Sequence, residues 1–431
     1  MNSDHLHSTD IRPSNGTPNR LPARALLIWF ISSFFVLFQF FLQLTSGDII
    51  TGVMKTFSAS VFKASVMISS YYYIYVLLQA PAGMLVDRYG PRRVLSLGSA
   101  VMTLGCLGVS VSVAAAAFTI SRVLMGAGAS IAFVGCLNLI RQWFPNRYFG
   151  VMTAATEALG LVGAAVCGVK LAGIVGYYGW QRCMWVTSFI SLVLASALWL
   201  VVRDRPHANM IKEKIERRSF TSFWAAVKVL CAQKKVWLNA LYSGLLFSVV
   251  TVFVSMWGIL YYKEVYHFSL LQSTNVVDMV FVGIGFCCPV ITYFDARVNC
   301  RKVFLVGGPI VGAMIMLTVM FVPNLGLWLS GFLMLLLGIC LSVYMLTFVI
   351  ANEISDIKTQ ACSIGIVNMG CVSTAPFLQP FVGYLIGRSE AIEKPVVLLH
   401  HFQHGLILFP VILLVASFLG WLLSVCAARV K

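Results

Sequence analysis

Charged side chains are scarce in this 431-residue chain, and acidic ones are particularly few. Charged residues make up 11% of the sequence, with only 15 Asp and Glu, whereas hydrophobic residues make up 59%. An average soluble domain is about 25% charged. So few polar groups would not cover a folded core in water. This scarcity excludes an ordinary cytosolic enzyme, a nucleic-acid-binding domain and a disordered chain.

Motifs typical of enzymes and ATP-driven pumps are also missing. The sequence has no Walker-type phosphate loop, no nucleophile triad and no Cys/His pattern with metal-ligand spacing. We therefore expect no enzymatic activity, no cofactor and no resident metal. His400, His401 and His404 precede the last hydrophobic run. They are interpreted as a solvent-exposed cluster at a helix start, with metal binding or pH sensing as the alternatives.

Long hydrophobic runs fill most of the chain, and a bilayer core takes about 20 apolar residues per helix. Such runs occur at residues 25–46, 66–86, 94–114, 117–140, 150–174, 183–202, 237–260, 270–292, 303–322, 326–350, 361–387 and 405–427. They predict an all-α, polytopic membrane protein with 12 transmembrane helices. The expected regions are a cytoplasmic tail at 1–23, a six-helix bundle at 24–202, a basic cytoplasmic linker at 203–235 and a second six-helix bundle at 236–428.

The net charge of +16 indicates which loops face the cytoplasm, because Lys and Arg concentrate in cytoplasmic loops. With the N-terminus placed inside, 23 of the 31 basic residues fall on the inner side and six in the outer loops. We therefore expect both termini in the cytoplasm. The positive charge indicates topology and does not point to a nucleic-acid partner.

The turn after the second hydrophobic run carries a distinctive charged motif. It follows the pattern G-x-x-x-D-R-x-G-x-R-R and consists of Gly83, Asp87, Arg88, Gly90, Arg92 and Arg93. Gly83 allows two helices to approach closely, and Gly90 permits a tight reversal into the third run. The motif resembles the signature loop of the major facilitator superfamily. A second match, Arg122-x3-Gly126-x-Gly128, lies in the fourth run.

This resemblance implies two pseudo-symmetric six-helix bundles that rock around a central cavity. It also implies that the loop around Asp87 and Arg92 latches the outward-facing state through charge contacts with neighbouring helix ends. The second half carries a weaker copy of the loop, since Pro81-x5-Asp87 is matched by Pro289-x5-Asp295. Basic residues follow the copy at Arg297, Arg301 and Lys302, whereas its glycine positions hold Ile291 and Val298.

Two further segments resemble bacterial nutrient-uptake branches of this superfamily, the phagosomal nutrient transporters and the anion:cation symporters. These segments are the Tyr-rich run from Tyr71 to Gly83 and Trp143-Phe144-Pro145. Such proteins import amino acids, nucleosides or organic acids with protons. Drug antiporters usually carry a Gly-Pro kink in span five, whereas residues 146–205 contain no proline, which favours import. Ala129 and Ser130 stand where anion symporters often have an acidic residue, which argues against an organic anion.

Ionisable side chains inside a membrane span are costly and are functional candidates by default. Four such residues stand out: Arg122, Glu157, Lys170 and Asp278. Glu157 and Asp278 are candidate proton sites, because a carboxyl group in a cavity of low dielectric binds and releases protons near neutral pH. The alternative for each is a fixed ion pair between helices. Asp48, at the outer end of the first run, is a possible partner for Arg122 or Lys170.

Polar and aromatic residues in the spans predict a substrate cavity. The candidates are Gln39, Gln43, Tyr72, Tyr75, Asn275, Tyr344, Asn368 and Gln379. Gln39 and Gln43 are one helical turn apart, as are Asn275 and Asp278. The alternative role for each is an interhelical hydrogen bond. As a set, these residues favour a small, polar substrate of modest charge.

Together these features predict a secondary active transporter in a bacterial inner membrane that imports a small polar nutrient with protons. Its expected partners are that small molecule, protons and the lipid bilayer, and it is expected to work as a monomer. Efflux or uptake of a larger metabolite, such as a drug or a siderophore, is the main alternative. A sensor that binds without transporting is a second alternative.

Overall fold

The computed structural model describes residues 23–44, 46–204, 228–298, 300–322, 324–355, 360–392 and 398–428. Within these ranges the regular structure is helical, and no strand occurs. Most of the linker predicted at 203–235 lies outside the described residues, as do residues 1–22 of the tail predicted at 1–23 and the last three residues.

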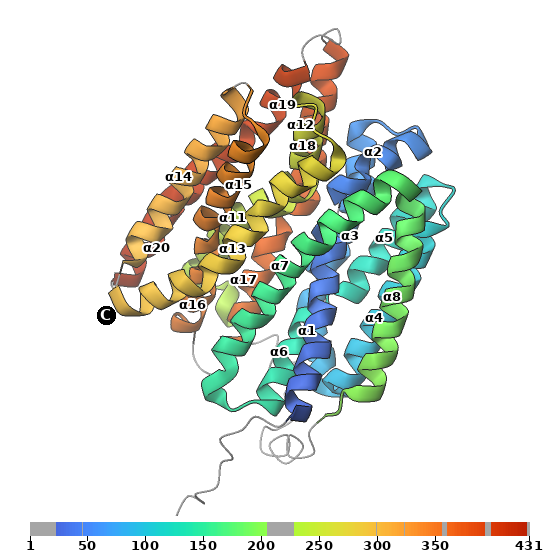
Figure 1. The fold of residues 1–431 in the computed structure, drawn as a ribbon. Helices are drawn as coiled ribbons and strands as arrows, with labels where there is room; N and C mark the ends of the chain where they lie inside the picture. Colours follow the sequence, from blue (N-terminus) through green and yellow to red (C-terminus); the bar gives the residue numbers. More distant parts are fainter. Residues whose placement is uncertain are drawn as a thin grey trace, which may run out of the picture.

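The first half of the chain folds into eight described helices (Figure 1). They are α1 (Ala23–Leu44), α2 (Ser46–Phe57), α3 (Val61–Tyr89), α4 (Pro91–Ser110), α5 (Ala115–Ala129), α6 (Ala132–Trp143), α7 (Asn146–Tyr178) and α8 (Trp180–Val201). Figure 1 shows them in blue and green as one group, which we call the N-terminal bundle. α4 packs against both α5 and α8, and α1 packs against α7.

The second half forms the C-terminal bundle, drawn in yellow to red (Figure 1). Its described elements are α11 (Lys234–Ser248), η1 (Val249–Trp257), α12 (Gly258–Val265), α13 (Leu270–Val298), α14 (Arg301–Phe321), α15 (Leu327–Leu341), η2 (Ser342–Tyr344), α16 (Met345–Glu353), α17 (Gln360–Ser373), α18 (Ala375–Ile392), α19 (Leu398–Leu406) and α20 (Leu408–Ala428). The two bundles meet where α7 packs along α13 and where α3 packs along α17 and α18.

The described residues contain 12 helical segments, some made of two or three consecutive elements, that are long and apolar enough to cross a membrane. Each overlaps one predicted hydrophobic run, so the prediction of 12 transmembrane helices is confirmed. The first span ends at Leu44, and the short helix α2 continues beyond it. Several spans contain more than one element, such as α5 with α6, and α15 with η2 and α16.

Two glycines with positive φ connect consecutive helices. Gly90 has φ +85° between α3 and α4, and Gly179 has φ +83° between α7 and α8. These positive φ angles strain any residue with a Cβ, which explains why glycine occupies both turns. At Gly90, Pro91 follows as the first residue of α4, where its missing N–H leaves no hydrogen bond unmade.

The seventh span departs from regular α-helix in its middle, which the sequence pattern did not predict. Its central nine residues, η1, form a π-helix, and all of them are buried. π-helical turns are rare in proteins, and many of those that do occur lie at functional sites. α11, η1 and α12 together form one of the candidate spans, Lys234–Val265.

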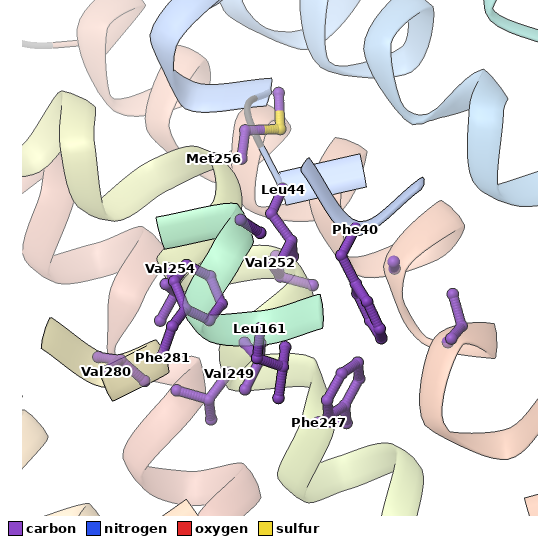
Figure 2. Close-up of a cluster of buried hydrophobic side chains, with 14 of the residues drawn as sticks. Phe40, Leu44, Leu161, Phe247, Val249, Val252, Val254, Met256, Val280 and Phe281 are labelled. Atoms are coloured by element: carbon purple, nitrogen blue, oxygen red, sulfur yellow. The ribbon is translucent and has the colours of Figure 1, made fainter. Parts of the chain in front are cut away.

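Hydrophobic side chains from both bundles pack together around this π-helix (Figure 2). Phe40 and Leu44 come from α1, Leu161 from α7, and Val280 and Phe281 from α13. Burying apolar area stabilises the contact between the bundles by about 25 cal/mol per Å² wherever it replaces water. The polar residues described below are embedded in this apolar interface.

Candidate functional site

Two glutamines of α1 bond to each other at the bundle interface. The Gln39 amide donates a hydrogen bond to the Gln43 amide oxygen, as their spacing of one helical turn allows. Both side chains are buried, with exposed fractions of 0% and 1%. Gln39 Oε1 and Gln43 Nε2 have no hydrogen-bond partner. The pair therefore retains one free acceptor and one free donor.

Three tyrosines of α3 pack against these glutamines. Tyr71 and Tyr75 stack with ring centroids 5.8 Å apart, and Tyr71 meets Tyr72 edge-on at 5.4 Å. The Tyr72 hydroxyl donates a hydrogen bond of 3.0 Å to the backbone oxygen of Gln43. The Tyr71 hydroxyl is next to Gln39 but has no hydrogen-bond partner. All three rings are buried.

The C-terminal bundle contributes polar groups from η1 and α18. Gln379 Nε2 donates a hydrogen bond of 2.7 Å to the backbone oxygen of Thr251, and the Ser255 hydroxyl donates to the same oxygen. Gln379 Oε1 has no hydrogen-bond partner. Ser255 and Gln379 both adjoin the Tyr72 hydroxyl, so polar groups of the two bundles meet at this ring.

A second amide pair links the bundles directly. Asn368 Nδ2 of α17 donates a hydrogen bond of 2.7 Å to Gln79 Oε1 of α3. Gln79 Nε2 has no partner and is buried, and the Gln79 side chain adjoins Tyr75. The predicted residues Gln39, Gln43, Tyr72, Tyr75, Asn368 and Gln379 thus lie along one interface between the bundles.

Glu157 of α7 contacts the opposite bundle through its carboxyl group. The Tyr344 hydroxyl of η2 donates a hydrogen bond of 3.0 Å to Glu157 Oε1. Both side chains are buried, and the Tyr344 ring packs on Phe247 with centroids 5.0 Å apart. Among the described residues, no Lys, Arg or His lies within ion-pair distance of Glu157. The two predicted residues therefore form one hydrogen-bonded pair between the bundles.

Asp278 of α13 is buried against α7. A Cβ added at Gly168 would lie 3.0 Å from Asp278 Oδ2, so glycine is what allows the carboxyl group to fit. This oxygen has no hydrogen-bond partner. Asn275 is placed differently: it is exposed and does not join Asp278 in the interface. The Lys170 side chain lies outside the described residues.

Asp48 of α2 is a third buried carboxyl group at the interface. The Thr274 hydroxyl of α13 donates a hydrogen bond of 2.9 Å to Asp48 Oδ1. Asp48 is close enough to Asp278 for the two carboxylates to repel each other when both are charged. A cavity of about 670 Å³ opens beside Asp48 and is also lined by Lys55, Trp180 and Lys263.

Arg122 of α5 is almost completely buried, with an exposed fraction of 2%. Its Nε and Nη2 atoms donate hydrogen bonds of 3.2 and 2.9 Å to the backbone oxygen of Ile68. Its guanidinium lies 5.2 Å from the centroid of the Tyr71 ring, and Nη2 is 3.4 Å from the Ser46 hydroxyl. No ion pair with Asp48 forms within the described part of the chain. These contacts hold Arg122 inside the N-terminal bundle.

The charged turn after α3 is tied to the end of α8. The backbone N–H of Arg92 donates a hydrogen bond of 3.1 Å to Asp204 Oδ1. Arg92 Nε donates to the backbone oxygen of Trp199 at 2.9 Å, and its guanidinium stacks on the Trp199 ring. Arg88 and Arg93 are exposed, and Gly83 is partly buried against α6. The Asp87 side chain lies outside the described residues.

The matching turn in the C-terminal bundle carries an ion-pair network. Arg301 donates to Asp295 through Nε and Nη2, with an Nη2–Oδ2 distance of 2.6 Å. Its Nη2 also donates to Glu353 Oε1 at 2.8 Å. Arg301 is therefore the basic residue that neutralises Asp295, the counterpart of Asp87.

The His residues before α20 form no described cluster. His404 is exposed in the last turn of α19, and the side chains of His400 and His401 lie outside the described residues. Within the described part of the chain, no group of three His, Cys, Asp or Glu residues is arranged to hold a metal ion.

Comparison with known proteins agrees with the loop motif and the fold. The family model described as Major Facilitator Superfamily matches residues 28–380, which is most of the chain. The chain belongs to the major facilitator superfamily. This is a family of transporters rather than enzymes, and the chain is a multi-pass membrane protein.

Two related transporters are distantly similar to this chain. An uncharacterised MFS-type transporter of Mycobacterium tuberculosis is 30% identical over 142 residues, which is 32% of this chain and 24% of that protein. A probable galactarate/D-glucarate transporter of Escherichia coli is 23% identical over 174 residues, covering 38% of this chain and 39% of that protein. The alignments thus span less than half of these relatives.

A solved structure of the superfamily matches almost the whole fold. A bacterial homologue of the human lysosomal transporter Spinster, in an inward-facing and unoccupied conformation, superimposes with a TM-score of 0.74. The match covers 94% of this chain and 98% of that chain at 14% identity. It confirms the predicted fold class.

Several interface residues were not predicted as site residues. Gln79 belongs to the quoted run from Tyr71 to Gly83, and a buried amide in a span is the same signal that selected Gln39. Asp48 was considered only as an ion-pair partner at a helix end. Ser255 and Thr274 carry no such signal, because hydroxyl residues are common throughout the spans and commonly bond their own helix backbone.

Proposed function

We propose that this chain imports a small polar nutrient, such as an amino acid, a nucleoside or an organic acid, together with protons by alternating access. The observation that carries the proposal is the position of Asp48, Glu157 and Asp278. All three carboxyl groups are buried between the bundles, and none has an ion-pair partner among the described residues. A proton symporter needs carboxyl groups that can bind and release protons at the interface where its two bundles separate and close.

A buried carboxyl group without a cation loses its unfavourable charge by binding a proton. Glu157 is bonded to Tyr344, and Asp48 to Thr274, across the interface between the bundles. Rocking of the bundles breaks these bonds and exposes the carboxyl groups to water on one side. Protonation and conformation are thereby linked, which is the requirement for coupling a proton gradient to transport.

In the proposed cycle, Asp278 or Glu157 takes a proton from the outer side, and the substrate binds between the bundles. Closure of the outer end and opening of the inner end then release both into the cytoplasm. The bundles are residues 24–202 and 236–428, the linker is 203–235, and both termini face the cytoplasm of a bacterial inner membrane. We propose that the monomer is the working unit and that the turn containing Asp87 and Arg92 latches one state.

The decisive experiment is uptake of radiolabelled amino acids, nucleosides and organic acids into proteoliposomes with an imposed pH gradient, acidic outside. We expect accumulation that collapses with a protonophore, and we expect Asp278→Asn to abolish it. Glu264→Gln is a matched control, because Glu264 lies in an exposed pair with Lys263. Absence of accumulation together with drug or siderophore export would refute the proposal in favour of efflux. Binding without flux would indicate a sensor.

A further inference from the structure

Four buried amide side chains at the bundle interface each retain one atom without a hydrogen bond. Gln39 Oε1 and Gln379 Oε1 are free acceptors, and Gln43 Nε2 and Gln79 Nε2 are free donors. We call these four glutamines the amide cluster. Their exposed fractions lie between 0 and 5%. Buried polar groups in folded proteins are almost always paired, so these four free amide atoms, together with the unpaired Tyr71 hydroxyl beside Gln39, need an explanation.

The free atoms belong to one connected region. Tyr72 links its two sides, because its hydroxyl bonds the backbone of Gln43 and adjoins Gln379 of the opposite bundle. Tyr71 adjoins Gln39, and Tyr75 adjoins Gln79. The stacked rings of Tyr71 and Tyr75 thereby connect Gln39 of α1 to Gln79 of α3. The region therefore offers donors, acceptors and aromatic rings from both halves of the transporter.

The number of free donors and acceptors on α1 does not depend on which way the Gln39 and Gln43 amides are turned. Each amide group has one oxygen and one nitrogen, and the bond between Gln39 and Gln43 uses one of each. One acceptor and one donor consequently remain. A ligand that satisfies the whole cluster must present at least two donors and two acceptors.

Charged groups border this region but do not belong to it. The Arg122 guanidinium bonds Ile68, Ser46 and the Tyr71 ring, which all belong to its own bundle. The Glu157 carboxyl group accepts a hydrogen bond from Tyr344. The hydrogen bonds of Arg122 are thus made within its own bundle, and the four free atoms of the amide cluster are all uncharged. The charge of an organic anion would also be repelled by Glu157 whenever that residue is ionised.

We infer that the amide cluster binds an uncharged solute with several hydroxyl or amide groups, the chemistry of a sugar or a nucleoside. Each hydroxyl of such a solute both donates and accepts, so two or three of them satisfy all four free atoms. The apolar face of its ring packs on the tyrosines. This inference rests on the proposed import function, and it narrows the substrate by removing organic acids and amino acids.

Binding by the purified full chain in detergent tests this inference without any gradient. Thermal shift and calorimetry are measured with uridine and D-xylose, with D-glucarate and nitrate, and with L-serine. We expect an uncharged probe to bind and the charged probes to be inactive. Binding of a charged probe alone would overturn the inference. Failure of proton-driven uptake by a chain that binds uridine or D-xylose would refute the proposed function and leave this inference standing.

A double variant distinguishes ligand binding by the amide cluster from a purely structural role, because the two roles predict different changes in affinity and melting temperature. Gln39→Leu with Gln43→Leu removes a pair that bonds only to itself, together with both unpaired atoms. We expect at least about tenfold weaker binding of the active probe and an unchanged or higher melting temperature of the ligand-free protein. Unchanged binding, or a lower melting temperature with unchanged binding, would overturn the inference.

Gln403→Leu is the matched control for the double variant. Gln403 of α19 uses its amide for a 2.8 Å hydrogen bond to the backbone oxygen of Met320, away from the cluster. Its substitution should lower the melting temperature and leave the affinity for the active probe unchanged. If the control weakens binding as much as the double variant does, the assay reports general destabilisation, and the assignment of the amide cluster is refuted.

Discussion

The Thr274 hydroxyl donates a 2.9 Å hydrogen bond to Asp48 Oδ1 and thereby connects α13 of the C-terminal bundle to α2 of the N-terminal bundle. Asp48 lies beyond the first membrane span, at the edge of a cavity of about 670 Å³. Because its two partners belong to different bundles, the bond must break if the bundles separate at this end. It therefore gives this end of the transporter a contact that depends on the charge of one carboxyl group.

Closure at this end is expected to depend on pH. Burial raises the pKa of Asp48 from 3.8 to about 7, and the Thr274 hydrogen bond lowers it in part. Asp278 and Cys183 face Asp48, and Lys55 and Lys263 line the adjoining cavity. When the end opens to water, the pKa returns toward its ordinary value. The stability of the closed form is therefore fully present below about pH 4 and is lost as pH rises to about 7.

Spin-label distances between Ser58→Cys and Leu271→Cys, in a background without other accessible cysteines, measure this closure. We expect the closed population to grow as pH falls below about 7 and to become independent of pH in Asp48→Asn. Thr274→Val removes a bond that favours the charged form, so it should shift the midpoint to higher pH. An Asp48→Asn profile identical to that of the parent would exclude Asp48 as the titrating group.

Substitutions of Glu157 and Tyr344 are expected to have different effects, one on proton coupling and the other on the rate of transport. Glu157→Gln keeps a side chain of the same shape but binds no proton, so net uptake driven by a pH gradient should fall at least about tenfold while exchange continues. Tyr344→Phe removes only the 3.0 Å hydrogen bond and should slow transport while leaving it gradient-driven. Counterflow and net uptake are measured in the same vesicles. Equal loss of both activities in Glu157→Gln would contradict a coupling role.

Close packing at Gly126 predicts a stability difference between two glycines. A Cβ at Gly126 would collide with the backbone oxygen of Tyr71, whereas a Cβ at Gly307 meets no atom within 4 Å. Gly126→Ala should therefore destabilise the protein by roughly 1–3 kcal/mol, because backbone atoms yield little. Gly307→Ala should be neutral or slightly stabilising, since alanine is the better helix former. Thermal unfolding in detergent compares them, and equal melting temperatures would be inconsistent with this packing.

The sequence predicted local relationships better than distant ones. The spacing of Gln39 and Gln43 predicted a shared helix face, and helix geometry alone produces their contact. Glu157 and Tyr344 were each predicted as candidates, but they are 187 residues apart and meet only when the bundles pack. Asn275 is one turn from Asp278 yet exposed, because the buried face ends between these two positions.

The middle of the seventh span shows what hydropathy does not encode. The segment from Val249 to Trp257 reads as an ordinary apolar helix, since hydropathy does not distinguish α from π hydrogen bonding. The π form becomes visible only in the packed bundle, where the Thr251 backbone oxygen accepts hydrogen bonds from both Ser255 and Gln379. The twelve spans follow from composition, whereas the site depends on contacts between distant helices.

The ion pairs at Arg301 predict unequal effects for their two partners. The Asp295 side chain is 4% exposed and that of Glu353 is 50% exposed. Arg301→Gln leaves the Asp295 carboxylate buried without a cation, which should destabilise the protein by roughly 1–3 kcal/mol, discounted because Arg301 itself is partly exposed. Glu353→Gln removes a solvated charge and should cost less than about 1 kcal/mol. If thermal unfolding ranks Glu353→Gln as the more damaging change, the neutralisation of Asp295 by Arg301 is not what stabilises this turn.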